Sequence, residues 1–181
     1  MPLTPEEKER RKAKRMLEKF AEYTLGTCKN KVATDFQRMI RAEAAAEPPG
    51  FVEAVVDGEI DVVWRGVGEC VCVTCGTVAW WKGAEIGGGT IETGHFIASR
   101  AASIIFEPTN ANPQCKRCNR HLSGNQANYE LWMQHIYGPD EPDRLRQLRH
   151  QPKQFTREEL VELRILYMAR AKAAELVIDT Y

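Results

Sequence analysis

The feature that most constrains the fold of this chain is a pair of Cys-x-x-Cys motifs that lie far apart in the sequence. Cys72 and Cys75 form the first motif, and Cys115 and Cys118 form the second. Two such motifs have the spacing of a four-thiolate zinc site. The sequence therefore predicts one structural zinc ion that joins the two segments. Four thiolates leave no open coordination position, so we expect this zinc to hold loops together without taking part in a reaction.

Cys70 offers an alternative in the first motif, as a ligand together with Cys72 or Cys75. A zinc knuckle needs two residues between its thiolates so that the backbone can wrap the metal. A glycine just after the second cysteine, here Gly76, suits the tight turn. We therefore favour Cys72 with Cys75 and expect Cys70 to be the spare thiol.

Length and composition narrow the class of protein. The chain has 181 residues, 43% hydrophobic and 28% charged, which suits one packed domain with appended helices. No apolar run approaches a membrane span and the amino terminus is charged, so we expect a soluble cytoplasmic protein without membrane contact. Zinc in a reducing compartment accounts for the cysteines better than disulfides do. The 25 basic and 25 acidic residues cancel, so a nucleic-acid partner must be argued from local clusters.

Two helices are predicted before residue 50. The first begins with a capping box at Thr4 and should end near Gly26. The second should begin with a capping pattern at Thr34, which leaves Cys28 in a turn. The first half of the first helix carries a run of cations, namely Lys8, Arg10, Arg11, Lys12, Lys14 and Arg15. Such a helix can follow DNA phosphates, bind a partner helix, or simply present a solvated face.

A β pattern follows residue 50. Two β-rich segments meet at Asp57-Gly58, a two-residue turn signal that predicts a hairpin over 51–65. Further along, the pattern predicts a strand that carries His95 and a second strand over 103–107. A helix should then hold the second cysteine pair and Asn119.

The last helix should begin with a capping box formed by Thr156 and Glu159. One face of this helix is predicted to carry an apolar stripe of Leu160, Leu163, Leu166, Tyr167, Ala174 and Val177. The stripe can pack on the domain or pair with a second chain, and the sequence leaves both alternatives open.

Three stretches resemble a known family. GHFIASR, FEPTNANPQC and CKRCNRHLSGN are similar to segments of the NinG or Rap recombination proteins of lambdoid phages, which are grouped with zinc-containing HNH, or ββα-metal, nucleases. The order Cys-x-x-Cys, His, Cys-x-x-Cys-Asn is also similar to that of phage endonuclease VII. The resemblance covers roughly Cys72 to Tyr137. It implies an α+β fold in which a zinc-braced ββα-metal core is flanked by helices, in a protein of the host cell cytoplasm.

The resemblance also implies a catalytic site. His95 takes the place of the general base, Asn110 that of the residue that ties the loop and orients the histidine, and Asn119 that of a metal ligand on the helix. A neutral imidazole can take a proton from water near pH 7. An Asn oxygen is a hard ligand that suits Mg2+ or Mn2+, and such a metal neutralises charge on the reacting phosphate and the departing 3′ oxygen.

One position departs from the wider HNH pattern. Many members carry an Asp or a His before the base as a second metal ligand, whereas this chain has Gly94. His121 is a candidate for the missing ligand or for a contact to the scissile phosphate, and Glu92 is a weaker candidate. The alternative for His121 is an ordinary residue on the helix surface.

A local group of cations lies beside the expected site. Lys116, Arg117 and Arg120 surround the second zinc pair, and Arg100 lies on the preceding loop. Such a cluster can bind DNA phosphates even on a protein without net charge. No set of residues is arranged to read base edges, so recognition of DNA shape is expected.

The patterns and the resemblance together predict three segments: an N-terminal helical arm over 1–50, a zinc-braced nuclease core over 51–137, and a C-terminal helical region over 138–181. We expect a metal-dependent DNA endonuclease that hydrolyses phosphodiesters in branched DNA such as Holliday junctions, where symmetric cleavage favours a homodimer. The alternatives are an HNH nuclease on ordinary duplex DNA, a non-catalytic zinc-dependent DNA-binding module, and an adaptor whose zinc stabilises a protein-binding surface.

Overall fold

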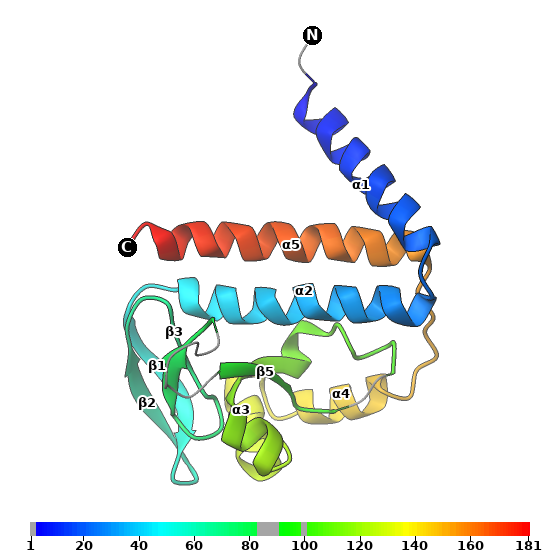
Figure 1. The fold of residues 1–181 in the computed structure, drawn as a ribbon. Helices are drawn as coiled ribbons and strands as arrows, with labels where there is room; N and C mark the ends of the chain where they lie inside the picture. The colour runs from blue at the N-terminus through cyan, green and yellow to red at the C-terminus, as the bar shows by residue number, and fades with distance from the viewer. Residues whose placement is uncertain (1–2, 83–90, 99–100) are drawn as a thin grey trace.

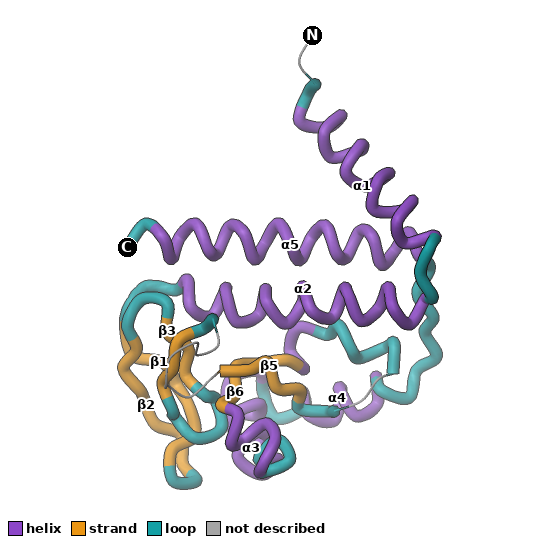
Figure 2. Tube along the Cα trace, in the orientation of Figure 1, coloured by secondary structure: helices purple, strands orange, loops and turns teal. Residues whose placement is uncertain are grey.

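Two long parallel helices form one side of the molecule. The computed structural model describes residues 3–82, 91–98 and 101–181 of the chain. In it, α2 (Leu25–Ala46) and α5 (Arg157–Asp179) lie side by side, and the strands and shorter helices lie on the other side of α2 (Figure 1). The described residues form three small antiparallel sheets of two strands each (Figure 2). The fold-class prediction is confirmed at the level of a mixed α+β chain.

The interface between α2 and α5 combines an apolar core with ion pairs along its length. Phe36 of α2 packs against Tyr167 of α5 with ring centroids 5.1 Å apart. Three ion pairs join the helices: Asp35 with Arg164, Arg38 with Glu175, and Glu43 with Arg170. These pairs are half-exposed and each contributes little, so burial of the apolar face supplies most of the stabilisation.

The first helix, α1 (Pro5–Ala21), begins with the predicted capping box at Thr4. It ends before the predicted boundary near Gly26. The reason is Thr24, whose hydroxyl accepts a hydrogen bond from the Thr27 amide at 3.2 Å and so caps a new helix. Gly26 therefore lies in the first turn of α2.

The predicted helix start at Thr34 is wrong. Thr34 lies inside α2, where its hydroxyl donates to the carbonyl of Asn30 at 3.1 Å. Cys28 is also inside α2 and fully buried, not in a turn. A buried stripe at Cys28, Val32, Phe36 and Met39 runs through this region at helical spacing. Burial of this stripe explains why the helix begins ten residues before the predicted start, with Thr24 as its N-cap.

α5 begins with the predicted capping box at Thr156. The predicted stripe is only partly right, because Leu166 is 48% exposed and Val177 is 42% exposed. The buried face consists of Leu160, Val161, Tyr167, Ala171, Ala174 and Ile178. Packing against α2 determines which face of α5 is buried. This face is rotated about the helix axis relative to the predicted stripe.

β1 (Gly50–Val56) and β2 (Glu59–Arg65) form the predicted hairpin. Asp57 and Gly58 have φ values of 50° and 90°, the conformation that an Asp-Gly hairpin turn requires. Trp132 attaches the hairpin to the body, since its indole Nε1 donates to the carbonyl of Glu53 at 3.0 Å.

Two further antiparallel pairs carry the candidate site. β3 (Glu69–Val71) pairs with β4 (Val78–Trp80), and the first cysteine motif lies between them. β5 (Ile91–His95) pairs with β6 (Ala111–Cys115). The register places Ile91 opposite Cys115 and His95 opposite Ala111. The second cysteine motif and His95 therefore lie at opposite ends of one short ladder.

The predicted strand over 103–107 is wrong, because these residues form turns and a 3-10 helix, Pro108–Asn110, follows them. Ile104 and Phe106 bury their side chains in the core. The apolar run, which resembles a strand in sequence, thus fills the interior without pairing. The partner of β5 is β6. Its sequence contains a proline, which is unusual within a strand, and so did not indicate one.

The helix predicted to hold the second cysteine pair is replaced by shorter elements. Cys115 ends β6, whereas Cys118 and Asn119 lie on a π-helical turn, Arg117–His121. α3 (Gln126–Tyr137) begins only after a further turn, and α4 (Glu141–Leu148) follows it. π-helical turns are rare in proteins, and those that occur often lie at functional sites.

The three predicted segments stay a prediction. The largest buried cluster draws on α1, α2 and α5 as well as on residues near β6, so the helices pack on the central segment. Among the described helices, none is long and apolar enough to cross a membrane.

Candidate metal centre and adjoining cleft

The four predicted zinc ligands meet in space. The sulfur atoms of Cys72, Cys75, Cys115 and Cys118 all lie within 4.8 Å of one another. A tetrahedral zinc with Zn–S bonds of about 2.3 Å spaces its sulfurs about 3.8 Å apart. The Sγ atoms of Cys75 and Cys115 are 3.7 Å apart. The donor set and the spacing therefore fit a zinc ion, which these four cysteines can bind.

The backbone between the first two cysteines has the shape of a knuckle. The amide of Gly76 donates to the carbonyl of Cys72 at 2.9 Å, and Gly76 has a φ of 69°. A Cβ atom at this position would lie 2.7 Å from Cγ2 of Val56. Both the backbone angle and the lack of space require glycine, as the sequence predicted.

Thiol acidity explains why a cation suits the cluster. A hydrogen bond to Cys75 and burial raise the pKa of Cys72, and burial raises the pKa of Cys118. Zinc stabilises the thiolate forms of such closely packed sulfurs. Cys70 lies outside the cluster: its thiol donates to the carbonyl of Arg41 at 3.3 Å, and burial raises its pKa to about 12.

His95 is half-buried at the end of β5. Its Nε2 lies 3.4 Å from the carbonyl oxygen of Ile105, and its ring faces Phe36 of α2. Burial lowers the pKa of His95 from its ordinary value of 6.5, and the hydrogen bond to Ile105 offsets this only in part. The imidazole is therefore neutral at pH 7.

A cleft of about 510 Å³ opens beside His95. Asn119 lines the same cleft from the π-helical turn, and Gln37 lines it from α2. The segment that leads into α3 contributes Ser123, Gly124 and Gln126. The structure thus brings His95 and Asn119 to one cavity although they come from different elements.

Asn110 is fully buried and fixes the loop after β5. Its Oδ1 accepts a hydrogen bond from the Ile97 amide at 2.8 Å, and its Nδ2 donates to the carbonyls of Ile97 and Ile104 at 3.3 and 3.4 Å. The amide of Phe96, next to His95, donates to the carbonyl of Asn110 at 2.8 Å. This network holds the chain on the C-terminal side of the histidine.

Asn119 is joined to Glu92 of β5. Its Nδ2 donates to Oε2 of Glu92 at 2.7 Å, which leaves its own Oδ1 as an acceptor. Arg120 also binds Glu92, with an Nη2–Oε1 distance of 2.6 Å. Burial opposes ionisation of Glu92, but the hydrogen bonds from Arg120 and Asn119 outweigh it and lower the pKa of this carboxyl. Glu92 is therefore an anion next to Asn119.

His121 does not share this position. It is exposed at the end of the π-helical turn, and the described residues that line the two hollows beside Asn119 do not include it. Of the two candidates for a second ligand, the one that the sequence ranked lower, Glu92, is the one beside Asn119.

Gly94 has no room for a side chain. A Cβ there would collide with Oε1 of Gln114 and would lie 2.6 Å from its Cδ. The buried side chain of Gln114 occupies this space because its Nε2 donates to Thr74 at 3.1 Å and to the carbonyl of Gly124 at 2.8 Å. The departure from the wider HNH pattern thus follows from packing: a neighbouring glutamine fills the place of the missing ligand.

A second hollow, of about 390 Å³, adjoins Asn119 on the side of α2. Arg41 lines it, and its Nη1 donates to the hydroxyl of Thr93 at 3.2 Å. Burial lowers the pKa of Arg41, and the negative charge of Glu92 opposes this shift. No motif in the sequence singles out Arg41, because α2 lies far from the cysteine motifs along the chain.

The structure describes three of the four cations that were predicted to contact phosphates. Lys116 and Arg117 are exposed, and Arg120 is exposed although it binds Glu92. All three lie beside the second cysteine pair. Arg100 lies outside the described residues.

Comparison with known proteins places the chain in a family. The family model described as Bacteriophage Lambda NinG protein matches residues 61–176. The chain belongs to the NinG family. It is similar to the proteins named Protein ninG of Escherichia phage 933W and Enterobacteria phage VT2-Sa, each 28% identical over 104 residues. These matches cover 56% of the chain and 46% of each NinG relative, so the chain spans about half of their length. No solved structure matches it. The family match begins after α1, α2 and β1, so it does not include Arg41.

We predict that Cys115→Ser abolishes stoichiometric zinc binding, because three thiolates do not complete the site, whereas Cys70→Ser retains one zinc per chain. Cys70 is a matched control, since it is also a buried cysteine near the cluster. Metal analysis of the purified proteins measures both. Zinc retained by Cys115→Ser, or lost from Cys70→Ser, would contradict this assignment of the ligands.

We also predict that Gly94→Asp, which restores the common HNH residue, lowers the free energy of unfolding by about 2–4 kcal/mol because it displaces Gln114 and breaks its buried hydrogen bonds. Gly50→Asp is the control, as a strand glycine whose added Cβ finds only one atom near, at 3.9 Å. Denaturant unfolding compares the two. A Gly94→Asp protein as stable as the wild type would show that the space is not filled.

Proposed function

We propose that this protein is a metal-dependent DNA endonuclease whose reaction takes place in the cleft between His95 and Asn119. The observation that carries the proposal is the meeting of a neutral histidine with Asn119 in one cleft, together with the hydrogen bond that joins Asn119 to Glu92 of the adjoining hollow. The arrangement of β5, β6 and a helical turn, joined by a four-cysteine cluster, supports a zinc-braced ββα-metal core. Membership of the NinG family agrees with the resemblance of the sequence to phage recombination nucleases.

His95 acts as the general base. When Nε2 donates its proton to the Ile105 carbonyl, Nδ1 carries the free lone pair that accepts a proton from water. The resulting hydroxide attacks the phosphorus atom, and the bond to the 3′ oxygen breaks. The lowered pKa of His95 keeps this base unprotonated at pH 7. Asn110 is a positioning residue that holds the neighbouring backbone.

Asn119 and Glu92 would hold Mg2+ or Mn2+. An amide oxygen and a carboxylate are hard donors of the kind that these ions prefer. When bound, such an ion neutralises charge that develops on the phosphate and the departing oxygen. Glu92 is paired with Arg120, so this arginine must release the carboxylate or move with it. Zinc in the cysteine cluster keeps the π-helical turn in place.

The substrate is branched DNA, with Lys116 and Arg117 as contacts to phosphates. This proposal extends the resemblance to phage recombination proteins and to endonuclease VII. Recognition by shape fits the lack of a base-reading set in these positions. A homodimer would cut two strands of a junction symmetrically.

A non-catalytic zinc-dependent DNA-binding module is the second candidate. One observation favours it: Glu92 is already neutralised by Arg120, so the cleft presents a satisfied ion pair in addition to its oxygen donors. This alternative expects DNA binding without cleavage.

We predict that the wild-type protein cleaves a labelled four-way junction with Mg2+ or Mn2+, and that His95→Ala lowers the single-turnover rate at least about 100-fold through loss of the base. His150→Ala is the control, because this exposed histidine lies away from the cleft. All three proteins are first matched for zinc content. Junction binding by every protein with cleavage by none would favour the non-catalytic module. A matched linear duplex tests the preference for branches.

A further inference from the structure

α1 projects away from the rest of the molecule. It leaves the body near the start of α5 and α2, and its N-terminal end points into solvent (Figure 1). Its C-terminal half is anchored, since Phe20 is fully buried and Ala13, Met16 and Leu17 pack against the main core cluster. The apolar side of α1 is therefore already covered.

The side of α1 next to this apolar side carries a basic stripe of Lys8, Arg11, Lys12, Arg15 and Lys19. Their spacing keeps all five within about 100° of the helix circumference at 3.6 residues per turn. The carboxylates of Glu6, Glu7, Glu9 and Glu18 fall outside this sector. The charges of the stripe are thus not interrupted by acids.

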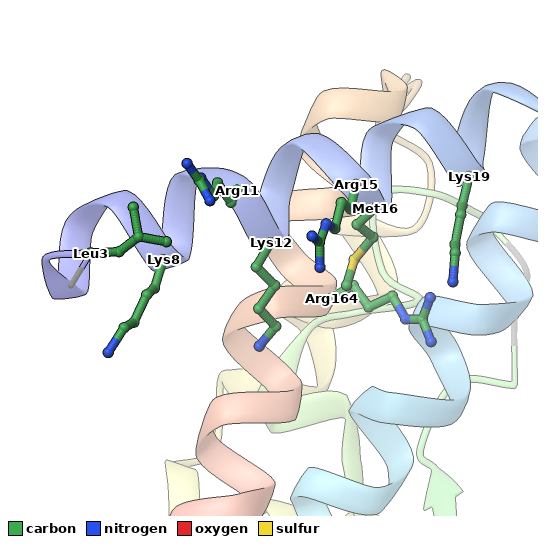
Figure 3. A pocket seen from close by; sticks show the side chains of 8 residues that line it. All are labelled: Leu3, Lys8, Arg11, Lys12, Arg15, Met16, Lys19 and Arg164. Atoms are coloured by element: carbon green, nitrogen blue, oxygen red, sulfur yellow. The ribbon is translucent and has the colours of Figure 1, made fainter. Parts of the chain in front are cut away.

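A groove of about 460 Å³ runs along the basic stripe. Figure 3 shows Lys8, Lys12 and Lys19 extending to the same side of α1, where Arg164 of α5 also lies. Arg164 pairs with Asp35 at 2.8 Å. Within the part of the chain that the structure describes, the five cations of the stripe form no ion pair. They are therefore available to an external anion.

We infer that the basic stripe binds the phosphodiester backbone of a DNA duplex, apart from the cleft beside His95. From Lys8 to Lys19 the stripe extends about 16 Å, which corresponds to about five base pairs along a duplex. Apart from cations, the described residues that line the groove are Leu3 and Met16, so it contacts phosphates without reading bases. That the phosphates belong to DNA rests on the proposed function.

The chemistry of α1 favours DNA over other anionic partners. A helix that lies on a membrane needs a free apolar face beside its cations, and that face of α1 packs on the core. A docked acidic peptide needs apolar anchors, and among the described lining residues Leu3 and Met16 alone are apolar. A row of exposed cations on a projecting helix matches the regular charges of a nucleic-acid backbone. On a branched DNA, α1 would then hold a second duplex arm while the cleft receives the first.

Two charge-matched variants of the full-length, zinc-loaded protein test this inference. Lys12→Gln/Arg15→Gln removes one lysine and one arginine from the stripe, and Arg10→Gln/Lys14→Gln removes the same two residue types from another face of α1. All four positions are exposed, and glutamine preserves helix propensity. Fluorescence anisotropy with a labelled four-way junction gives the affinity over a range of salt concentrations. We expect about tenfold weaker binding and a salt slope smaller by about 1.8 for the stripe variant, with less than a twofold change for the control.

Equal loss of junction affinity in both variants, or no loss in either, would overturn the inference. The inference requires that cations of the stripe contribute more to binding than cations on the other face of α1. Tighter binding of wild type to anionic vesicles or to polyglutamate than to the junction would also overturn it. Failure of the nuclease proposal can be told apart from failure of this inference. In the former case no protein cleaves the junction, but the stripe variant still binds it more weakly than the wild type.

Discussion

The cluster of four cysteines is the constraint on which the candidate site depends. It joins a knuckle between β3 and β4 to the end of β6 and to the π-helical turn that carries Asn119. Neither segment has enough regular structure to fix its own position, since β3 and β4 have three residues each. A closed metal site with four thiolates supplies this fixation, and its binding free energy becomes folding free energy.

Buried hydrogen bonds connect the cysteine cluster to the strand that carries His95. The hydroxyl of Tyr129 donates to the carbonyl of Gly94 at 3.0 Å and accepts from Asn112 at 3.2 Å, so α3 is tied to both strands of the ladder. Gln114 connects the same ladder to Thr74 of the knuckle. Because these groups are buried, loss of one partner leaves the other unsatisfied at a cost of about 1–3 kcal/mol. The cleft therefore lies on a rigid frame, with exposed cations around it.

Local signals in the sequence were reliable where a few residues determine the geometry. The cysteine spacing, the Asp57-Gly58 turn and the capping boxes at Thr4 and Thr156 each encode their structure within a few positions. Prediction failed where distant packing decides between equal local options. Thr34 begins a capping pattern in the sequence, yet it lies inside α2, whose buried stripe already starts at Cys28.

The site shows the same division. Residues near the motifs could be found from spacing and resemblance, whereas the place of Arg41 depends on how α2 crosses the strands, which no motif records. Position 94 requires glycine because the side chain of Gln114, on the paired strand, fills the space that a larger residue would need. Such long-range contacts set Glu92 beside Asn119 and leave His121 in solvent.

Anomalous scattering from crystals of the zinc-loaded protein soaked in Mn2+ tests the proposed site most directly. We expect a zinc peak among the four cysteines and a manganese peak bound by Asn119 and Glu92, with Arg120 released from the carboxylate. A zinc peak alone, with Arg120 still bound to Glu92 at saturating Mn2+, would contradict the claim that this cleft is a metal-dependent hydrolytic site.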